Sequence, residues 1–165
     1  MIGPYVVQIE QLSLGQHKFN FEADKLIFER NGNDEVLDAN FQIDLELYKT
    51  GNMMDMKFHY AGNVDLACDR CNDPVTLPIE DESKLVVKYG QAHHEDLDEL
   101  VVLEDHEHEI DLEQYFYESL SLIIPFRHVH EEKDCNKEIL KKLGKIQEES
   151  SNDDVDPRWQ KLKEL

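Results

Sequence analysis

The chain contains no apolar run close to the length of about 18 residues that a helix needs to span a bilayer. Its first residues, MIGPYVVQIEQL, place no basic segment ahead of an apolar stretch, so a secretory signal peptide is not expected. These two absences exclude the membrane and secreted classes of protein. We therefore expect a cytoplasmic protein that makes no membrane contact.

Cysteine and cationic side chains are also scarce. Three cysteines, an odd number, do not make a disulfide framework, so in a reducing compartment they are thiols or metal ligands. The 17 lysines and arginines are outnumbered by 37 aspartates and glutamates, which gives a formal net charge of -20. A polyanion repels phosphate backbones, so we expect weak or no binding to naked RNA and basic proteins as better partners. Solubility alone is the simpler explanation of this charge.

Signatures of catalysis are missing as well. The sequence has no glycine-rich phosphate loop, no nucleophile elbow and no HExxH helix. Its carboxylate pairs, such as Asp96 with Asp98 and Glu107 with Glu109, lie in acidic runs where such pairs are expected by chance. The sequence therefore predicts a protein that is not an enzyme.

The first two-thirds of the chain has the pattern of β-strands. Apolar and polar residues alternate over 41–48 and again over 54–60, and the Gly51-Asn52 turn between them predicts a β-hairpin. Residues 61–63, Ala-Gly-Asn, interrupt the second run and predict a bulge. Further strands are expected at 5–12, 17–21, 75–79, 84–89 and 100–103, with an exposed acidic loop at 91–99.

Helical patterns dominate the remainder. Asp111 is a suitable N-cap, with Gln114 placed as in a capping box, and Pro125 ends the helix that follows. Residues 136–149 carry a second apolar stripe. Residues 150–155 are polar and acidic, typical of a linker, and Asp156-Pro157 starts a short last helix.

We therefore expect an α+β fold. An antiparallel sheet packs against one main helix, and the C-terminal tail is helical. A sheet that curls towards a barrel is the alternative arrangement. Residues 1–130 would form the sheet-plus-helix domain. Residues 131–165 would form the helical tail with its acidic linker and short C-terminal helix, whose Trp159 and Leu162 lie on one face with Arg158 beside them.

Two short clusters can carry metal chemistry. Cys68 and Cys71, separated by two residues at a turn between strands, can occupy adjacent corners of a tetrahedral site. His130 and Cys135 complete a set of three thiolates and one imidazole, which is a normal structural zinc set. The alternative is isolated buried cysteines beside a histidine-containing surface loop, and the spacing alone leaves both interpretations open.

Three segments together resemble a known family. Leu66-Ala67-Cys68-Asp69-Arg70-Cys71 followed by Pro74 is similar to its C-x-R-C segment, and residues 109–112, running through a helix to Pro125, are similar to its second block. Val155-Asp156-Pro157-Arg158-Trp159 with Lys161-Leu162-Lys163 is similar to its C-terminal ending. By the order and spacing of these segments, the chain resembles the YceD-like family of bacterial large ribosomal RNA accumulation proteins.

The resemblance implies a role in synthesis, processing or stability of large-subunit ribosomal RNA. It implies large-subunit ribosomal proteins or pre-ribosomal particles as partners. A terminal helix of two turns needs a surface to fold against, so it either docks on its own domain or anchors such a partner, and the candidate partner-binding residues are Arg70, Arg158, Trp159 and Leu162. The rival hypotheses are a metal-dependent hydrolase or nuclease using the cysteine-histidine cluster, and an acidic chaperone of one basic ribosomal protein.

Many family members carry a G-L-C-x-x-C-G segment, whereas this chain has only Cys135 there, with His128 and His130 upstream.

Overall fold

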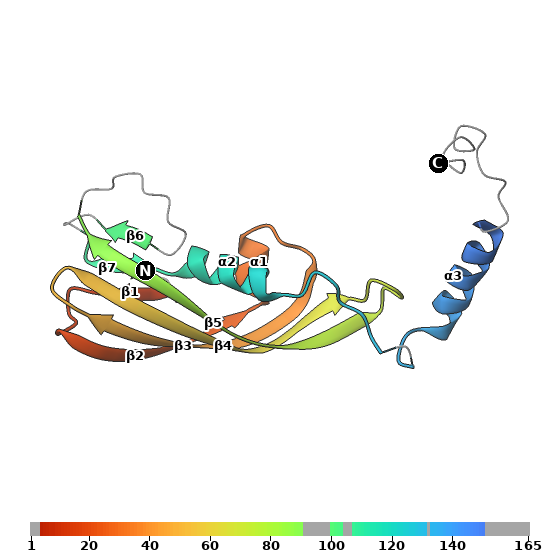
Figure 1. Ribbon diagram of the computed structural model, residues 1–165, viewed down its shortest axis with the longest axis horizontal. Coiled ribbons are helices and arrows are strands. Elements are labelled where there is room, and N and C mark those ends of the chain that lie inside the picture. Colours follow the sequence, from red (N-terminus) through yellow and green to blue (C-terminus); the bar gives the residue numbers. More distant parts are fainter. Residues whose placement is uncertain (1–3, 91–99, 104–106, 132, 151–165) are drawn as a thin grey trace, which may run out of the picture.

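The computed structural model describes residues 4–90, 100–103, 107–131 and 133–150 of the 165-residue chain. The expected acidic loop at 91–99, the linker at 151–155 and the last helix with Arg158, Trp159 and Leu162 lie outside the described residues. One large sheet organises the described part of the chain (Figure 1), and two of the three described helices lie on one of its faces.

The main sheet has five strands in the order β2-β3-β4-β5-β6. They are β2 (Gly15–Asp24), β3 (Val36–Lys49), β4 (Met53–Ala67), β5 (Pro74–Tyr89) and β6 (Leu100–Leu103). The first four pair antiparallel, but β6 pairs parallel to β5, so the sheet is mixed. Among the described residues β2 and β6 form its two edges, and the sheet is open rather than closed into a barrel. A mostly β structure with a few helices is compatible with the expected α+β class, whereas the barrel alternative is not confirmed.

Alternation in the sequence becomes alternation in burial. In β3, Phe41, Ile43, Leu45 and Leu47 are buried while the residues between them are exposed, because successive side chains of a strand point to opposite faces. The hairpin predicted between β3 and β4 is confirmed, and both the N–H and the hydroxyl of Thr50 donate to the Met53 carbonyl at 2.8 Å. Residues 75–79 and 84–89, expected as two strands, belong to the single strand β5.

The bulge predicted at 61–63 is wrong. β4 pairs without interruption there, and Gly62 lies opposite Phe41. A Cβ added at Gly62 would lie 2.1 Å from the carbonyl oxygen of Asn40, so this position needs glycine for close approach of two backbones. The register shift lies instead in β3, between Val36 and Asp38.

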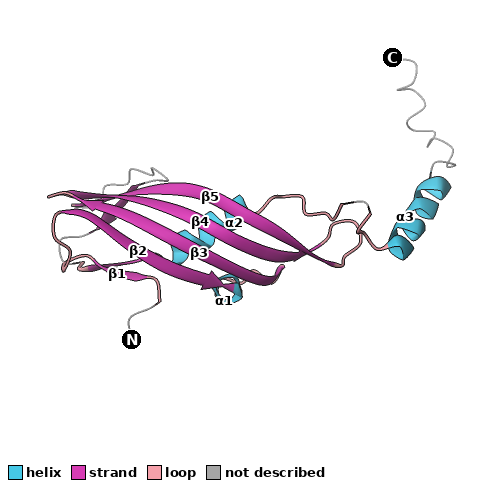
Figure 2. Ribbon diagram, turned by 90° about the horizontal axis from the view of Figure 1, so that it is seen from below, coloured by secondary structure: helices cyan, strands magenta, loops and turns pink. Residues whose placement is uncertain are grey.

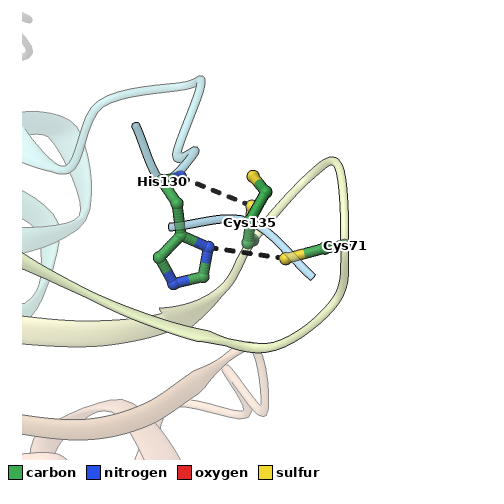
Figure 3. Close-up of side chains that lie close together, drawn as sticks. Cys71, His130 and Cys135 are labelled. Carbon is green, nitrogen blue, oxygen red and sulfur yellow. Dashed lines mark hydrogen bonds between the residues drawn. The ribbon is translucent and has the colours of Figure 1, made fainter. Parts of the chain in front are cut away.

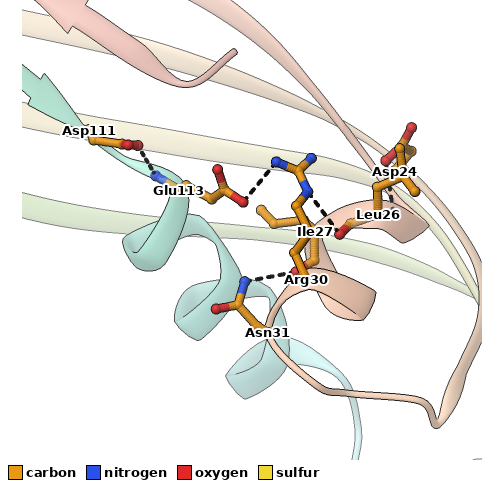
Figure 4. A network of polar contacts seen from close by, with 7 residues as sticks. All are labelled: Asp24, Leu26, Ile27, Arg30, Asn31, Asp111 and Glu113. Carbon is orange, nitrogen blue, oxygen red and sulfur yellow. Dashed lines mark hydrogen bonds and ion pairs between the residues drawn. The ribbon is translucent and has the colours of Figure 1, made fainter. Parts of the chain in front are cut away.

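Two helices lie on the same face of the sheet (Figures 1 and 2), so one main helix is an incomplete description. They are α1 (Lys25–Arg30), which the sequence analysis did not predict, and α2 (Glu113–Ile123). Asp24 caps α1 by accepting a hydrogen bond from the Leu26 N–H at 2.9 Å. Arg30 reaches across to Glu113 with an ion pair of 2.9 Å, which ties α1 to the start of α2 (Figure 4).

The start of α2 differs from the predicted capping box. Asp111 still belongs to β7 (Glu109–Asp111), which pairs with β1 (Val6–Gln8) in a small second sheet, and its carboxylate accepts from the Glu113 N–H at 2.9 Å. Leu112 occupies the N-cap position and is buried in the main core, and its N–H donates to the Tyr5 carbonyl at 3.1 Å. Gln114 donates to Glu118 instead of closing a box.

The main core lies between the sheet and α2. Phe116 is fully buried, and its ring centroid lies 5.3 to 5.6 Å from those of Phe21, Phe58 and Tyr5. A second, smaller apolar cluster forms at the far end of the sheet around Cys68, Cys71, Val75 and Cys135. No cysteine belongs to the main core cluster, so the two groups of buried residues are separate, although the partly buried Leu77 packs against both.

The third described helix, α3 (Lys137–Ser150), extends away from the end of the sheet (Figures 1 and 2). It confirms the helix expected at 136–149. Ile139 and Leu140 pack against the small cysteine cluster, whereas Leu143 is 41% exposed. Among the described residues, no helix is long and apolar enough to cross a membrane.

Candidate metal centre

The centre is built first from the tight connection between β4 and β5. The Cys68 N–H donates to the Asp73 carbonyl at 2.9 Å, and the Asn72 N–H donates to the Cys68 carbonyl at 2.8 Å. Asn72 has a φ of 61°, a left-handed conformation that asparagine tolerates better than most side chains. This turn holds the Cys68 and Cys71 side chains on the same side of the connection, and both are buried.

A distant segment, residues 128–130, pairs with this turn. The Asp69 N–H donates to the His128 carbonyl at 2.9 Å, and the Asp69 carboxylate accepts from the His128 N–H at 2.8 Å. The His130 N–H points to the Cys68 sulfur at 3.5 Å. Arg70 donates from Nη2 to the His130 carbonyl at 3.0 Å. The residues between the two cysteines therefore fix the backbone of the segment that carries His130.

Cys135 arrives by a separate turn. The Asp134 N–H donates to the Glu131 carbonyl at 2.9 Å, which reverses the chain and buries Cys135 to 3% exposure. Asn136 follows at once, and its side chain both accepts from the Glu138 N–H at 3.1 Å and donates to the Asp73 carboxylate at 3.1 Å. Asn136 thus caps the first turn of α3 and fastens it to the β4–β5 connection.

These elements bring four ligand atoms together. One atom from each of Cys68, Cys71, His130 and Cys135 lies within 4.8 Å of every other, and Figure 3 shows the His130 ring turned towards the Cys71 sulfur with Cys135 beside it. The Cys71 sulfur lies 3.4 Å from His130 Nδ1. Tetrahedral zinc, with Zn–S of about 2.3 Å and Zn–N of about 2.0 Å, separates a sulfur from a nitrogen by about 3.5 Å. The donor set and its spacing fit a zinc ion.

The tautomer of His130 also suits a ligand. Nε2 lies 2.9 Å from the Pro74 carbonyl, and because a carbonyl only accepts, Nε2 carries the hydrogen and Nδ1 has its lone pair towards the sulfurs. Hydrogen bonds of this kind orient metal-binding histidines and increase their basicity. The Pro74 hydrogen bond first, and the Cys68 sulfur second, raise the pKa of His130.

The three thiols do not share one environment. Burial raises the pKa of Cys68, but hydrogen bonds from the N–H groups of His130, Arg70 and Cys71 outweigh burial and lower this pKa to about 6. Burial raises the pKa of Cys135 to about 11, and its hydrogen bonds with Cys68 and Cys71 add to the increase. Three thiolates at this spacing repel one another, so joint ionisation of the set needs a cation between them.

The structure thus brings together all four residues that the sequence proposed as metal ligands. Of the two histidines near Cys135, His130 faces the sulfurs, while His128 Nε2 lies 3.2 Å from the Asp69 carboxylate. Arg70, proposed as partner-binding, directs its guanidinium to the His130 carbonyl. The other three proposed partner-binding residues, Arg158, Trp159 and Leu162, lie outside the described residues.

Sequence reasoning missed two residues that support the centre. Asp69 was visible only as part of the C-x-R-C segment, and no local signal links it to a residue 59 positions away. Asn136 had a recognisable signal, since asparagine directly before a helix is a common N-cap, but its bond to Asp73 is not encoded locally. Both residues connect the turn to the segment that follows α2.

Fold and site together describe a sheet with a few helices, in which three cysteines and one histidine that could hold a metal ion lie between the end of the sheet and a projecting helix. A family model described as "Large ribosomal RNA subunit accumulation protein YceD" matches residues 56–165, about two-thirds of the chain. The chain belongs to this family, and the match contains all four residues of the cluster. Searches of curated proteins and of solved structures gave no match. The family description assigns a role in the accumulation of large-subunit ribosomal RNA.

Proposed function

We propose that the chain is a cytoplasmic ribosome-assembly factor that supports large-subunit ribosomal RNA by binding rather than by catalysis. Its partners on this proposal are large-subunit ribosomal proteins or pre-ribosomal particles, in keeping with the family description. The observation that carries the proposal is the composition of the cluster, in which four protein side chains supply four ligand atoms. A catalytic zinc keeps a coordination position for water, whereas four protein ligands close the site.

On this proposal one zinc ion has a structural role. It would link Cys68 and Cys71, at the end of the sheet, with His130 and Cys135, which precede α3. The main core is separate from this cluster, so the zinc would position the C-terminal segment without being needed to fold the sheet. The chemistry that it supplies is charge compensation for three thiolates.

Charge favours one more specific version of the proposal. The formal net charge of -20 suits a basic partner, and ribosomal proteins are basic, so an acidic chaperone of one such protein is the second candidate. A hydrolase or nuclease is the weaker alternative, because it would need an open coordination position in a set that already has four ligand atoms.

Sedimentation of the tagged full-length protein tests the proposal. We expect it to migrate with large-subunit precursors, and we expect its depletion to lower large-subunit ribosomal RNA while small-subunit RNA is maintained. Purified protein incubated with ribosomal RNA and zinc should leave the RNA intact. Migration wholly free of ribosomal particles, together with unchanged large-subunit RNA on depletion, would refute the assembly role, and RNA cleavage would refute the binding mechanism.

A further inference from the structure

The pairing of β3 with β4 shifts register at the beginning of β3. Val36 pairs with Leu66 and Asp38 pairs with Asp65, so Leu37 is an extra residue with no partner across the strand pair. Such a bulge redirects a side chain, and Leu37 is 43% exposed although it is a large apolar residue in a strand. The bulge therefore presents a leucine outward at the end of the sheet where the cysteine cluster lies.

Leu37 faces an open groove with a volume of about 540 Å³. One wall is the β4–β5 connection with Ala67 and Cys68, and the other includes Ile139 from the first turn of α3. Leu37 and Ile139 give the groove an apolar character, and Ile139 holds its place by packing against the cysteine cluster. The candidate metal centre and the groove thus share residues, since Cys68 belongs to both and Ile139 packs against the cysteines.

The rim of the groove is acidic. Asp34 and Glu35 line it, and both side chains are exposed. Asp69 and Arg70 also line it, but the Asp69 carboxylate accepts from the His128 N–H and Arg70 donates to the His130 carbonyl. Since the opposite charges of Asp69 and Arg70 offset each other, the net negative charge of the groove comes from the carboxylates of Asp34 and Glu35.

We propose that this groove binds a segment of a basic protein, with an apolar side chain of that segment against Leu37 and Ile139 and flanking lysines or arginines near Asp34 and Glu35. The inference rests on the proposed function and names the surface and the chemistry of the partner. A nucleic acid is the poorer occupant, because its phosphates would face two carboxylates and the net charge of the chain. An apolar anchor surrounded by complementary charge is the usual composition of a small binding hot spot.

Paired leucine variants provide the first test. Leu37→Asn removes the apolar anchor, and Leu14→Asn is the matched control, because Leu14 is 70% exposed and directly precedes β2 at the opposite end of the sheet. We expect Leu37→Asn to bind purified large-subunit precursors at least about tenfold more weakly, while Leu14→Asn binds like the natural protein. Zinc content and melting temperature, measured for both variants, show whether each remains folded.

Charge reversal provides an independent variant. Asp34→Lys with Glu35→Lys should weaken binding, and the weakening should diminish as salt is raised. Glu80→Lys with Glu82→Lys, on the exposed outer face of β5, makes the same change in net charge away from the groove and should bind more tightly than the groove variant. If the two charge variants bind equally well and Leu37→Asn binds fully, the proposal that this groove is the binding site is refuted. If the natural protein binds no precursor at all, the proposed function fails instead.

A photocrosslinker identifies the occupant directly. Leu37→p-benzoylphenylalanine in the full-length protein, irradiated in cells and analysed by mass spectrometry, should form an adduct with a protein rich in lysine and arginine. The same residue at position 14 should not form that adduct. A crosslink from position 37 to RNA, to a second copy, to residues 151–165 of the same chain or to an acidic protein would overturn the inference, and so would the absence of a crosslink.

Discussion

Arg70 and His130 lie 60 residues apart, and the Arg70 guanidinium donates to the His130 backbone carbonyl at 3.0 Å. This hydrogen bond fixes the backbone of a candidate ligand from within the turn that carries two of the other candidate ligands, Cys68 and Cys71. Groups that orient metal ligands typically change metal affinity by about 10- to 100-fold when they are removed. The arginine of the C-x-R-C segment thus has a structural role in this chain.

We predict that Arg70→Ala lowers zinc affinity by about 10- to 100-fold, because the His130 segment loses its tether to the turn. Competition with a chelating dye measures this effect. Lys133→Ala, a change of one exposed cation that pairs with Glu131 at the surface, is the control and should leave affinity unchanged. Unaltered zinc affinity combined with weaker partner binding would instead assign Arg70 to the partner interface.

We predict that the protein purified without chelators contains one zinc ion per chain. Cys71→Ser and His130→Ala should reduce this content strongly, since each removes one of four ligands. His128→Ala should retain zinc, because its ring faces Asp69 rather than the sulfurs. Elemental analysis measures the content, and the absence of zinc from the natural protein would disprove the site.

Removal of zinc should loosen the C-terminal segment and leave the sheet folded. Structural zinc contributes on the order of 10–16 kcal/mol in small domains that have no other core, but here the main core contains none of the cysteines. Hydrogen exchange after chelation should therefore accelerate around residues 128–140, while the amides of β3 and β4 stay protected. Global unfolding on chelation would contradict the separation of the two clusters.

Gly62→Ala should destabilise the protein by about 3 kcal/mol, at the upper end of overpacking effects. The new Cβ would lie 2.1 Å from the Asn40 carbonyl oxygen and 2.7 Å from the Phe41 Cα, and these backbone atoms cannot move independently of the sheet. Gly51→Ala is the control, because a Cβ there meets nothing within 4 Å, and its effect should stay within about 0.5 kcal/mol. Urea denaturation compares the two variants, and equal stabilities would refute the close approach.

Phe116→Ala should cost about 3–5 kcal/mol of the free energy of unfolding. Its buried ring contacts aromatic rings from β2, β4 and the N-terminal segment, so truncation leaves a cavity that several elements share. Leu122→Ala, on the same helix with an 85% exposed side chain, should change stability by less than about 0.5 kcal/mol. Thermal unfolding compares the stabilities of the two variants. A loss of stability in Phe116→Ala as small as that in Leu122→Ala would contradict a core centred on Phe116.

The sequence by itself determined the local elements of this protein. Period-two alternation fixed the hairpin of β3 and β4, because one face of each strand is buried, and the apolar stripes fixed α2 and α3. The residue types of the C-x-R-C segment and of His130 and Cys135 also fixed the chemistry of the candidate centre. These features depend on neighbours in the chain, which is why a local pattern predicts them.

Tertiary structure decided what depends on partners far along the chain. In a sequence, a glycine that breaks the alternation of a strand is compatible with a bulge or with the close approach of two backbones. The register of β4 against β3 shows that Gly62 is a site of close approach and that the bulge lies at Leu37. The short helix α1 and the parallel pairing of β6 likewise follow from packing on the sheet. Above all, Cys71 and His130 meet although 59 positions separate them, because the hydrogen bonds of Asp69 and Arg70 close that long loop in space.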